Sequence, residues 1–158
     1  MPYGYLYPYA NSKGISMSTK TALFTLTLSL LLGNGVASAT DFNKGLDAAR
    51  SGDYETALSE LNHLAKQGDA LAQYELGQRY AKGLGVLEND TTATQWFTLA
   101  ANQGDVPAQY ALGYMYQDGD GVLIDLERAH AWSSLASASG DENSIALTKH
   151  IAREMTSD

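Results

Sequence analysis

Residues 70–105 read ALAQYELGQRYAKGLGVLENDTTATQWFTLAANQGD, and residues 106–141 read VPAQYALGYMYQDGDGVLIDLERAHAWSSLASASGD. Aligned with each other, these two 36-residue stretches are identical at 16 positions. Unrelated sequences of ordinary composition would match at roughly 2 or 3. Internal repeats of this length are typical of solenoids, in which each repeat packs on its neighbours and the array binds a partner. We therefore expect a short solenoid.

Each repeat is predicted to form two helices joined by a glycine-containing loop, so the expected fold is all-α. Gly77 lies inside the first helix and weakens it, so we expect it to mark a close approach of two helices. The tryptophans at the equivalent positions 96 and 132 are expected to be wedges between helices. Apolar residues of the first helix recur at helical spacing, at Ala72, Leu76 and Tyr80.

Aspartate and asparagine residues mark the predicted helix starts. Their side chains accept hydrogen bonds from the free amides of the first helical turn. The 36-residue spacing also reaches back to a shorter, divergent unit before the two repeats. The predicted caps are Asp53, Asn89 and Asp125 for the second helices, and Asp69, Asp105 and Asp141 for the helices that follow.

The first 39 residues have the features of a secretory signal peptide. Lys20 precedes an apolar run from Ala22 to Leu32, and Ala37-Ser38-Ala39 supplies the small residues that signal peptidase requires. This run is shorter than the roughly 20 residues that span a bilayer. We expect cleavage after Ala39. Residues 1–16 are either an upstream over-extension of the reading frame, which we favour, or an unusual start of the signal.

The charge and cysteine content limit the possible partners. All 18 acidic residues follow residue 39, whereas Lys13 and Lys20 precede it, which leaves 8 basic residues and a formal net charge of −10 in the mature chain. Nucleic-acid binding needs a positive surface, so no nucleic-acid partner is expected. The chain has no cysteine, so it lacks the attachment point of a lipoprotein. We expect a periplasmic or secreted protein without a stable membrane anchor after signal cleavage.

The pattern A-Q-Y-x-L-G-x-x-Y-x-x-G-x-G-V occurs within Ala70–Gly104 and again within Val106–Gly140. It closely resembles the Sel1-like repeat family, which is related to tetratricopeptide repeats. The resemblance implies a right-handed superhelix of antiparallel helix pairs whose first helices line a concave face. It also implies an adaptor, scaffold or regulator that works through protein–protein contacts.

The sequence is therefore predicted to comprise a signal peptide, three repeats and a capping helix. The predicted segments are residues 1–39, the signal peptide; 40–69, an N-terminal capping repeat that resembles a tetratricopeptide unit; 70–105 and 106–141, the two Sel1-like repeats; and 142–158, a C-terminal capping helix and tail.

We expect an exported, non-enzymatic adaptor that binds a protein or peptide. Two alternatives stay open. One is a protein that binds or hydrolyses cell-wall components such as β-lactams or peptidoglycan, as the resemblance to cysteine-rich secreted members suggests; the lack of cysteine weakens that link. The other is a purely structural part of a larger assembly.

No combination of residues predicts a metal site, a cofactor site or a catalytic centre. An EF-hand calcium loop starting at Asp118 would need an oxygen ligand at position 122, glycine at 123 and glutamate at 129, but these positions hold Val122, Leu123 and Ala129. Among the histidines, only His150 is followed three or four residues later by a carboxylate, that of Glu154. His130 and Ser134 would lie on one helix, where interior amides cannot act as oxyanion donors.

Partner-binding residues are expected where the two repeats differ. Tyr114 and Met115 are apolar where the first repeat has the polar Gln78 and Arg79. Tyrosine and methionine are enriched in the cores of interfaces. The alternative, that this pair packs under the C-terminal helix, stays open. The residues predicted for the concave binding surface are Tyr114, Met115, Gln78, Gln117, Glu75 and Arg79.

Overall fold

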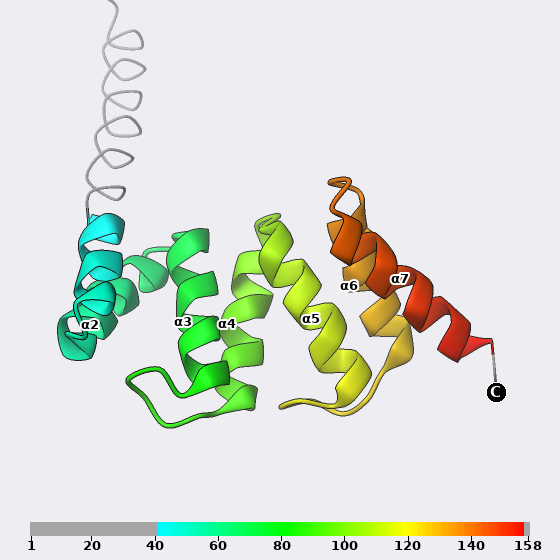
Figure 1. The fold of residues 1–158 in the computed structure, drawn as a ribbon, viewed down its shortest axis with the longest axis horizontal. Helices are drawn as coiled ribbons and strands as arrows, with labels where there is room; N and C mark the ends of the chain where they lie inside the picture. Colours follow the sequence, from blue (N-terminus) through cyan, green and yellow to red (C-terminus); the bar gives the residue numbers. More distant parts are fainter. Residues whose placement is uncertain (1–40, 157–158) are drawn as a thin grey trace, which may run out of the picture. The chain divides into compact units, whose positions relative to one another are not determined.

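A computed structural model describes residues 41–156. Every regular element in this range is a helix, as predicted. Consecutive helices pack against each other in a row (Figure 1), and the last helix also contacts α5. Residues 41–50 are helical, followed by α2 (Tyr54–Lys66), α3 (Ala70–Lys82), α4 (Asp90–Asn102), α5 (Val106–Asp118), α6 (Leu126–Ser137) and α7 (Glu142–Met155).

The predicted signal peptide and its cleavage site after Ala39 lie outside the described residues. Within residues 41–156, no helix combines the length and the apolar character needed to cross a bilayer.

The predicted helix caps are confirmed. A side-chain oxygen of each capping residue accepts a hydrogen bond from the backbone amide three residues later, which satisfies one of the free amides of the first turn. The caps are Asp53 on α2, Asp69 on α3, Asn89 on α4, Asp105 on α5, Asp125 on α6 and Asp141 on α7.

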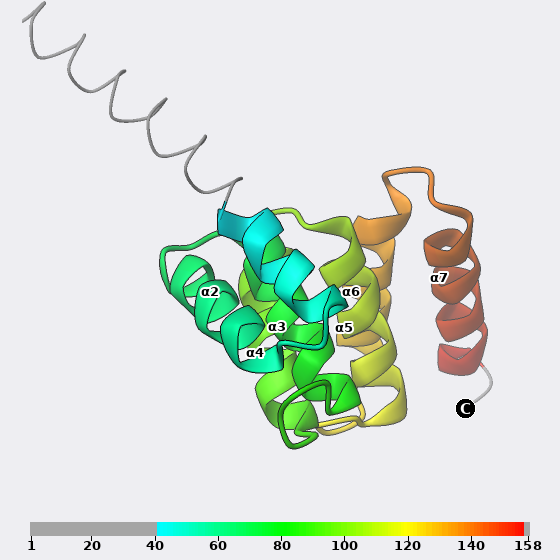
Figure 2. The same cartoon turned by 60° about the vertical axis from the view of Figure 1, so that its left-hand side comes forward.

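Two long links, residues 83–89 and 119–125, each join the two helices of a repeat. Gly83 and Gly119 cap the preceding helices in the left-handed conformation, with φ of 63° and 82°. Glycine adopts this conformation without steric cost. Both links lie at the same edge of the row of helices (Figure 1), as the second view also shows (Figure 2).

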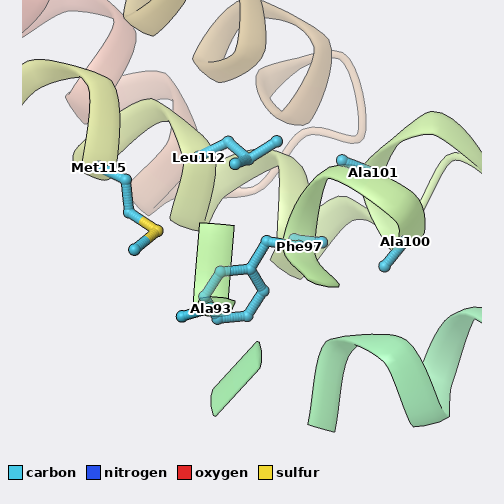
Figure 3. Packing of buried hydrophobic residues seen from close by; sticks show 7 residues of the cluster. Ala93, Phe97, Ala100, Ala101, Leu112 and Met115 are labelled. Carbon is cyan, nitrogen blue, oxygen red and sulfur yellow. The ribbon is translucent and has the colours of Figure 1, made fainter. Parts of the chain in front are cut away.

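The core is divided into three clusters along the row. One lies between α2 and α3 and includes Leu61, Leu64 and Leu76. The central cluster joins α4 to α5; in Figure 3, Ala93 and Phe97 of α4 lie near Leu112 and Met115 of α5. The third joins α6 to α7 and consists of Ala129, Leu147 and Ile151.

The repeated glycines and tryptophans pack as the sequence predicts. A Cβ on Gly77 would lie 2.5 Å from the ring of Phe97, and one on Gly113 would lie 3.1 Å from Leu147. Two helices therefore approach closely at each glycine. Trp96 and Trp132 are half-buried and pack against two different core clusters, which confirms that they are wedges between helices.

Candidate partner-binding surface

The main difference between the repeats lies on one solvent-facing surface of α3 and α5. We call it the outer face, and it is formed by Tyr74, Gln78, Tyr110 and Tyr114. Tyr114 on α5 is 43% exposed, and its ring meets the ring of Tyr110 edge-on, with centroids 5.0 Å apart. At the equivalent places on α3, Gln78 donates a hydrogen bond of 2.6 Å to the hydroxyl of Tyr74. One repeat thus presents an aromatic pair where the other presents a polar pair.

The tyrosines beneath this face stay neutral at physiological pH. Hydrogen bonding to Tyr114, together with burial, raises the pKa of Tyr110 to about 12. Burial raises the pKa of Tyr74 above its usual value near 10. Glu75, which is half-buried, adds a carboxylate on α3. The face therefore offers aromatic surface together with neutral hydroxyl and amide groups. Glu75 is the one predicted site residue with a carboxylate.

Gln117 is held by the last helix. Its Nε2 donates a hydrogen bond of 2.9 Å to Oε2 of Glu154 on α7, and its Oε1 is buried without a partner among the described residues. Gln117 is half-buried at the end of α5. The C-terminal helix therefore covers this end of α5, and Gln117 connects the two helices.

The expectation that Met115 and Arg79 lie on an exposed face is wrong. Their exposed fractions are 7% and 5%. Met115 packs in the central cluster between α4 and α5, where the hydroxyl of Thr94 lies 3.4 Å from its sulfur, and not under the C-terminal helix. Successive helical residues are turned by about 100°, so Met115 faces inward while Tyr114 faces outward.

The buried stripe of the first helices explains this error. On α5 the stripe comprises Ala108, Leu112 and Met115, so it continues to the seventh residue after its start. The spacing of Ala72, Leu76 and Tyr80 instead predicts that the stripe continues to the eighth residue, which is also on a helical face. Tyr116, at that eighth position, is only half-buried. The apolar Met115, seven residues after Ala108, could have been recognised from the sequence as part of this stripe.

Exposed apolar residues on the links between helices were missed by the sequence analysis. Leu87 is 91% exposed, and its equivalent in the second repeat, Leu123, is 90% exposed. Binding residues were expected where the two repeats differ, so these two identical leucines were not among the candidates. Their exposure shows that a residue shared by both repeats can lie entirely at the surface.

A shallow hollow of about 480 Å³ lies beside α4 and the link 119–125. Three threonines, at positions 91, 94 and 98, line it, and each hydroxyl donates to a backbone carbonyl. Leu99 and Tyr116 add apolar surface. Each of these hydroxyls already donates its proton within the fold, so toward a ligand it can only accept, and Gln95 adds a side-chain amide to the lining.

The side chains considered for chemistry form two separate pairs, one on α6 and one on α7. The hydroxyl of Ser134 is 3.5 Å from Nδ1 of His130, and His150 lies 3.3 Å from Glu154. Residues 41–156 contain no group of three or more histidine, cysteine, aspartate or glutamate side chains that could hold a metal ion.

The repeat geometry agrees with a known family. The Sel1 repeat family model matches residues 70–105 and 106–141. Residues 70–105 and 106–141 are therefore two Sel1 repeats. Its fold is similar to the Sel1 repeat protein from Oxalobacter formigenes, with 30% identity and a TM-score of 0.67 over 72% of this chain and 46% of that one.

A second similar structure is c5321, a protective antigen present in uropathogenic Escherichia coli strains, which displays an SLR fold. Identity is 30% and the TM-score is 0.65, over 74% of this chain and 26% of that one. The chain thus spans less than half the length of either protein. No curated protein matches it. Sel1-repeat proteins generally mediate protein–protein interactions, and their fold is typically a non-enzymatic scaffold.

Proposed function

We propose that this Sel1-repeat protein is an exported, non-enzymatic adaptor that binds a protein partner through the outer face of α3 and α5. The resemblance to the family implies that this face is concave. The observation that carries the proposal is the exposed Tyr114, which lies edge-on against Tyr110 where the other repeat has a polar pair.

Tyr114 has the properties of an interface anchor. Tyrosine is enriched among the residues that contribute most to binding, because it offers a large contact area and a hydroxyl while few torsions must be fixed. The edge-on contact with Tyr110 supports the ring before any partner arrives. A preorganised side chain loses less entropy on binding. Gln78, one repeat earlier, adds an amide to the same face.

The export part of the proposal rests on the sequence of the first 39 residues, with a charged start, a short apolar run and Ala37-Ser38-Ala39. The absence of cysteine is compatible with an oxidising compartment, because no thiol can be oxidised there. Mass spectrometry of the protein recovered from its native host tests this part. A mature N-terminus at Thr40 is expected, and recovery of the uncleaved chain from the cytoplasm would contradict export.

The binding part is tested by affinity capture from an envelope extract. The variant Tyr114→Gln is the matched comparison, because glutamine is the residue that the other repeat has at this position. One partner should be retained by the wild type and lost by this variant, while helical circular dichroism stays unchanged. Retention of the same proteins by both would show that the outer face of α5 is not the binding surface.

A further inference from the structure

Arg79 occupies a buried position that is apolar in the other repeat. The equivalent residue is Met115, and the two side chains are 5% and 7% exposed. Met115 fills an apolar cluster. Arg79 instead places a permanently charged guanidinium at the same depth of the fold.

The guanidinium of Arg79 has few partners. Its Nη1 donates a long hydrogen bond of 3.5 Å to the carbonyl of Leu84, and Nε has no hydrogen-bond partner among the described residues. No ion pair within 4.0 Å joins Arg79 to a carboxylate in residues 41–156. Buried charges in proteins are normally paired. The guanidinium of Arg79 therefore lacks the negatively charged partner that a buried charge normally has.

A hollow of about 310 Å³ lies beside this side chain, between the helical residues 41–50 and α3. Leu46, Tyr54 and Leu84 form apolar walls, and Arg79 lines the hollow together with Glu75. Arg50 also lines it, and this exposed side chain bonds Asp47 at 3.0 Å. An anion in the hollow would meet two arginines and one carboxylate, that of Glu75.

We propose that this hollow binds a carboxylate group of a peptide, with Arg79 as its anchor. The planar guanidinium can donate two parallel hydrogen bonds to the two oxygens of one carboxylate. The apolar walls would receive the side chains beside that carboxylate. The inference rests on the proposed function in one respect, namely that the protein binds a polypeptide.

A carboxylate fits this site better than a phosphate group. A phosphate monoester carries close to two negative charges at neutral pH, and Glu75 in the lining repels the second charge as well as the first. The mature chain is also strongly acidic overall, with 18 acidic residues against 8 basic ones after residue 39. A single negative charge with a flat pair of oxygens matches the one buried guanidinium.

The experiment uses the purified protein and a library of seven-residue peptides in two sets, one with amidated and one with free carboxyl termini. Enrichment of aspartate or glutamate in the amidated set would identify a side-chain carboxylate as the ligand. Enrichment that requires a free terminus would identify the terminal carboxylate. Either result is expected to disappear in Arg79→Met, with binding of a retained peptide weakened about tenfold or more.

The variants are chosen so that folding and binding can be separated. Arg79→Met is expected to fold, because methionine fills this position in the next repeat. Glu75→Gln is expected to strengthen peptide binding, because it removes the carboxylate that lines the hollow. If Glu75 instead served as the partner of Arg79, Glu75→Gln would lower stability and leave peptide binding unimproved. The Nε–H resonance of Arg79 should shift when a retained peptide is added.

Three results would overturn the site: no retained peptide, retention of the same peptides by Arg79→Met, or displacement of peptide by inorganic phosphate at lower concentration than by acetate. These failures are distinct from failure of the proposed function. Tyr114→Gln is expected to change capture of the protein partner and to leave carboxylate enrichment in the library unchanged. Loss of one effect without the other therefore shows which surface was assigned wrongly.

Discussion

Gly121, in the link between α5 and α6, lies directly against Asp90, the first residue of α4. A Cβ on Gly121 would lie 2.2 Å from the carbonyl carbon of Asp90, and the hydroxyl of Thr91 donates to the carbonyl of Gly121 at 3.2 Å. The same contact occurs one repeat earlier, where a Cβ on Gly85 would lie 2.6 Å from Cβ of Tyr54, the first residue of α2. Each glycine link therefore packs on the start of a helix in the preceding unit.

This contact predicts that Gly121→Ala is strongly destabilising. Gly104→Ala is the matched control, because both glycines have positive φ, 69° and 89°, but a Cβ on Gly104 would meet nothing within 4 Å. The control should lose about 1–2 kcal/mol from the unfavourable backbone conformation. Gly121→Ala should lose about 1–3 kcal/mol more, because backbone atoms of Asp90 must move. Equal losses in urea unfolding would contradict the role given to this contact.

The close approach at Gly77 leads to a second prediction. Alanine is favoured over glycine in a helix by about 1 kcal/mol, yet a Cβ here would lie 2.5 Å from the ring of Phe97. We expect a net loss of about 1–2 kcal/mol in the free energy of unfolding. Gly113→Ala should cost less, because its nearest neighbour is the end of Leu147 at 3.1 Å. Gly77→Ala should cost less in a Phe97→Leu background than in the wild type, because the ring that it would meet is gone. An equal cost in both backgrounds would place the strain elsewhere.

Met115 and Tyr114 are adjacent but should respond differently to truncation. Met115→Ala opens a cavity between α4 and α5 and should lower the free energy of unfolding by about 2–5 kcal/mol. Tyr114→Ala removes an exposed ring and should cost about 1 kcal/mol or less. Thermal unfolding followed by circular dichroism compares them. A similar loss for both would contradict the inward position of Met115.

The helix starts were predictable from sequence because capping is local. Asp69 and Asp105, for example, accept hydrogen bonds from amides only three residues away. The burial of Arg79 and Met115 was harder to predict from the sequence, because helical spacing alone allows the buried stripe to continue at either the seventh or the eighth residue after its start. Contacts with α4 decide between them at Met115.

The hollow at Arg79 depends on residues far apart in the sequence. It forms where Leu46 and Tyr54 of the divergent first unit meet α3. That unit is shorter and lacks the shared tryptophan, so the two full repeats do not predict which of its side chains face α3. The fold could therefore be predicted from repetition, whereas a site formed by the non-repeated part could not.

Asp141 predicts a pH dependence of stability. Hydrogen bonds from the hydroxyl and the amide of Ser144 hold the pKa of this carboxyl below its usual value near 3.8. The stabilisation is therefore fully present above that pH and is lost as the pH falls through the lowered pKa. Asp141→Asn keeps a cap but not the titration, so the stability difference from wild type should shrink below pH 4.

The converse change at Asn89 tests the same reasoning. Asn89 caps α4 without titrating, so Asn89→Asp should add a dependence on pH in the same acidic range. Stability is measured by urea unfolding between pH 2.5 and pH 7, conditions chosen about these pKa values. Unchanged profiles for both variants would show that these caps do not contribute to the acid sensitivity of the fold.

The most direct test of the partner-binding account is site-specific photocrosslinking in the native host. A photoreactive phenylalanine analogue replaces Tyr114 in one variant and Leu135, which is also exposed but lies on α6, in another. We expect one discrete crosslinked protein from position 114 and none of that protein from position 135. Crosslinks to the same protein from both positions, or from position 135 alone, would contradict a partner-binding face on α3 and α5.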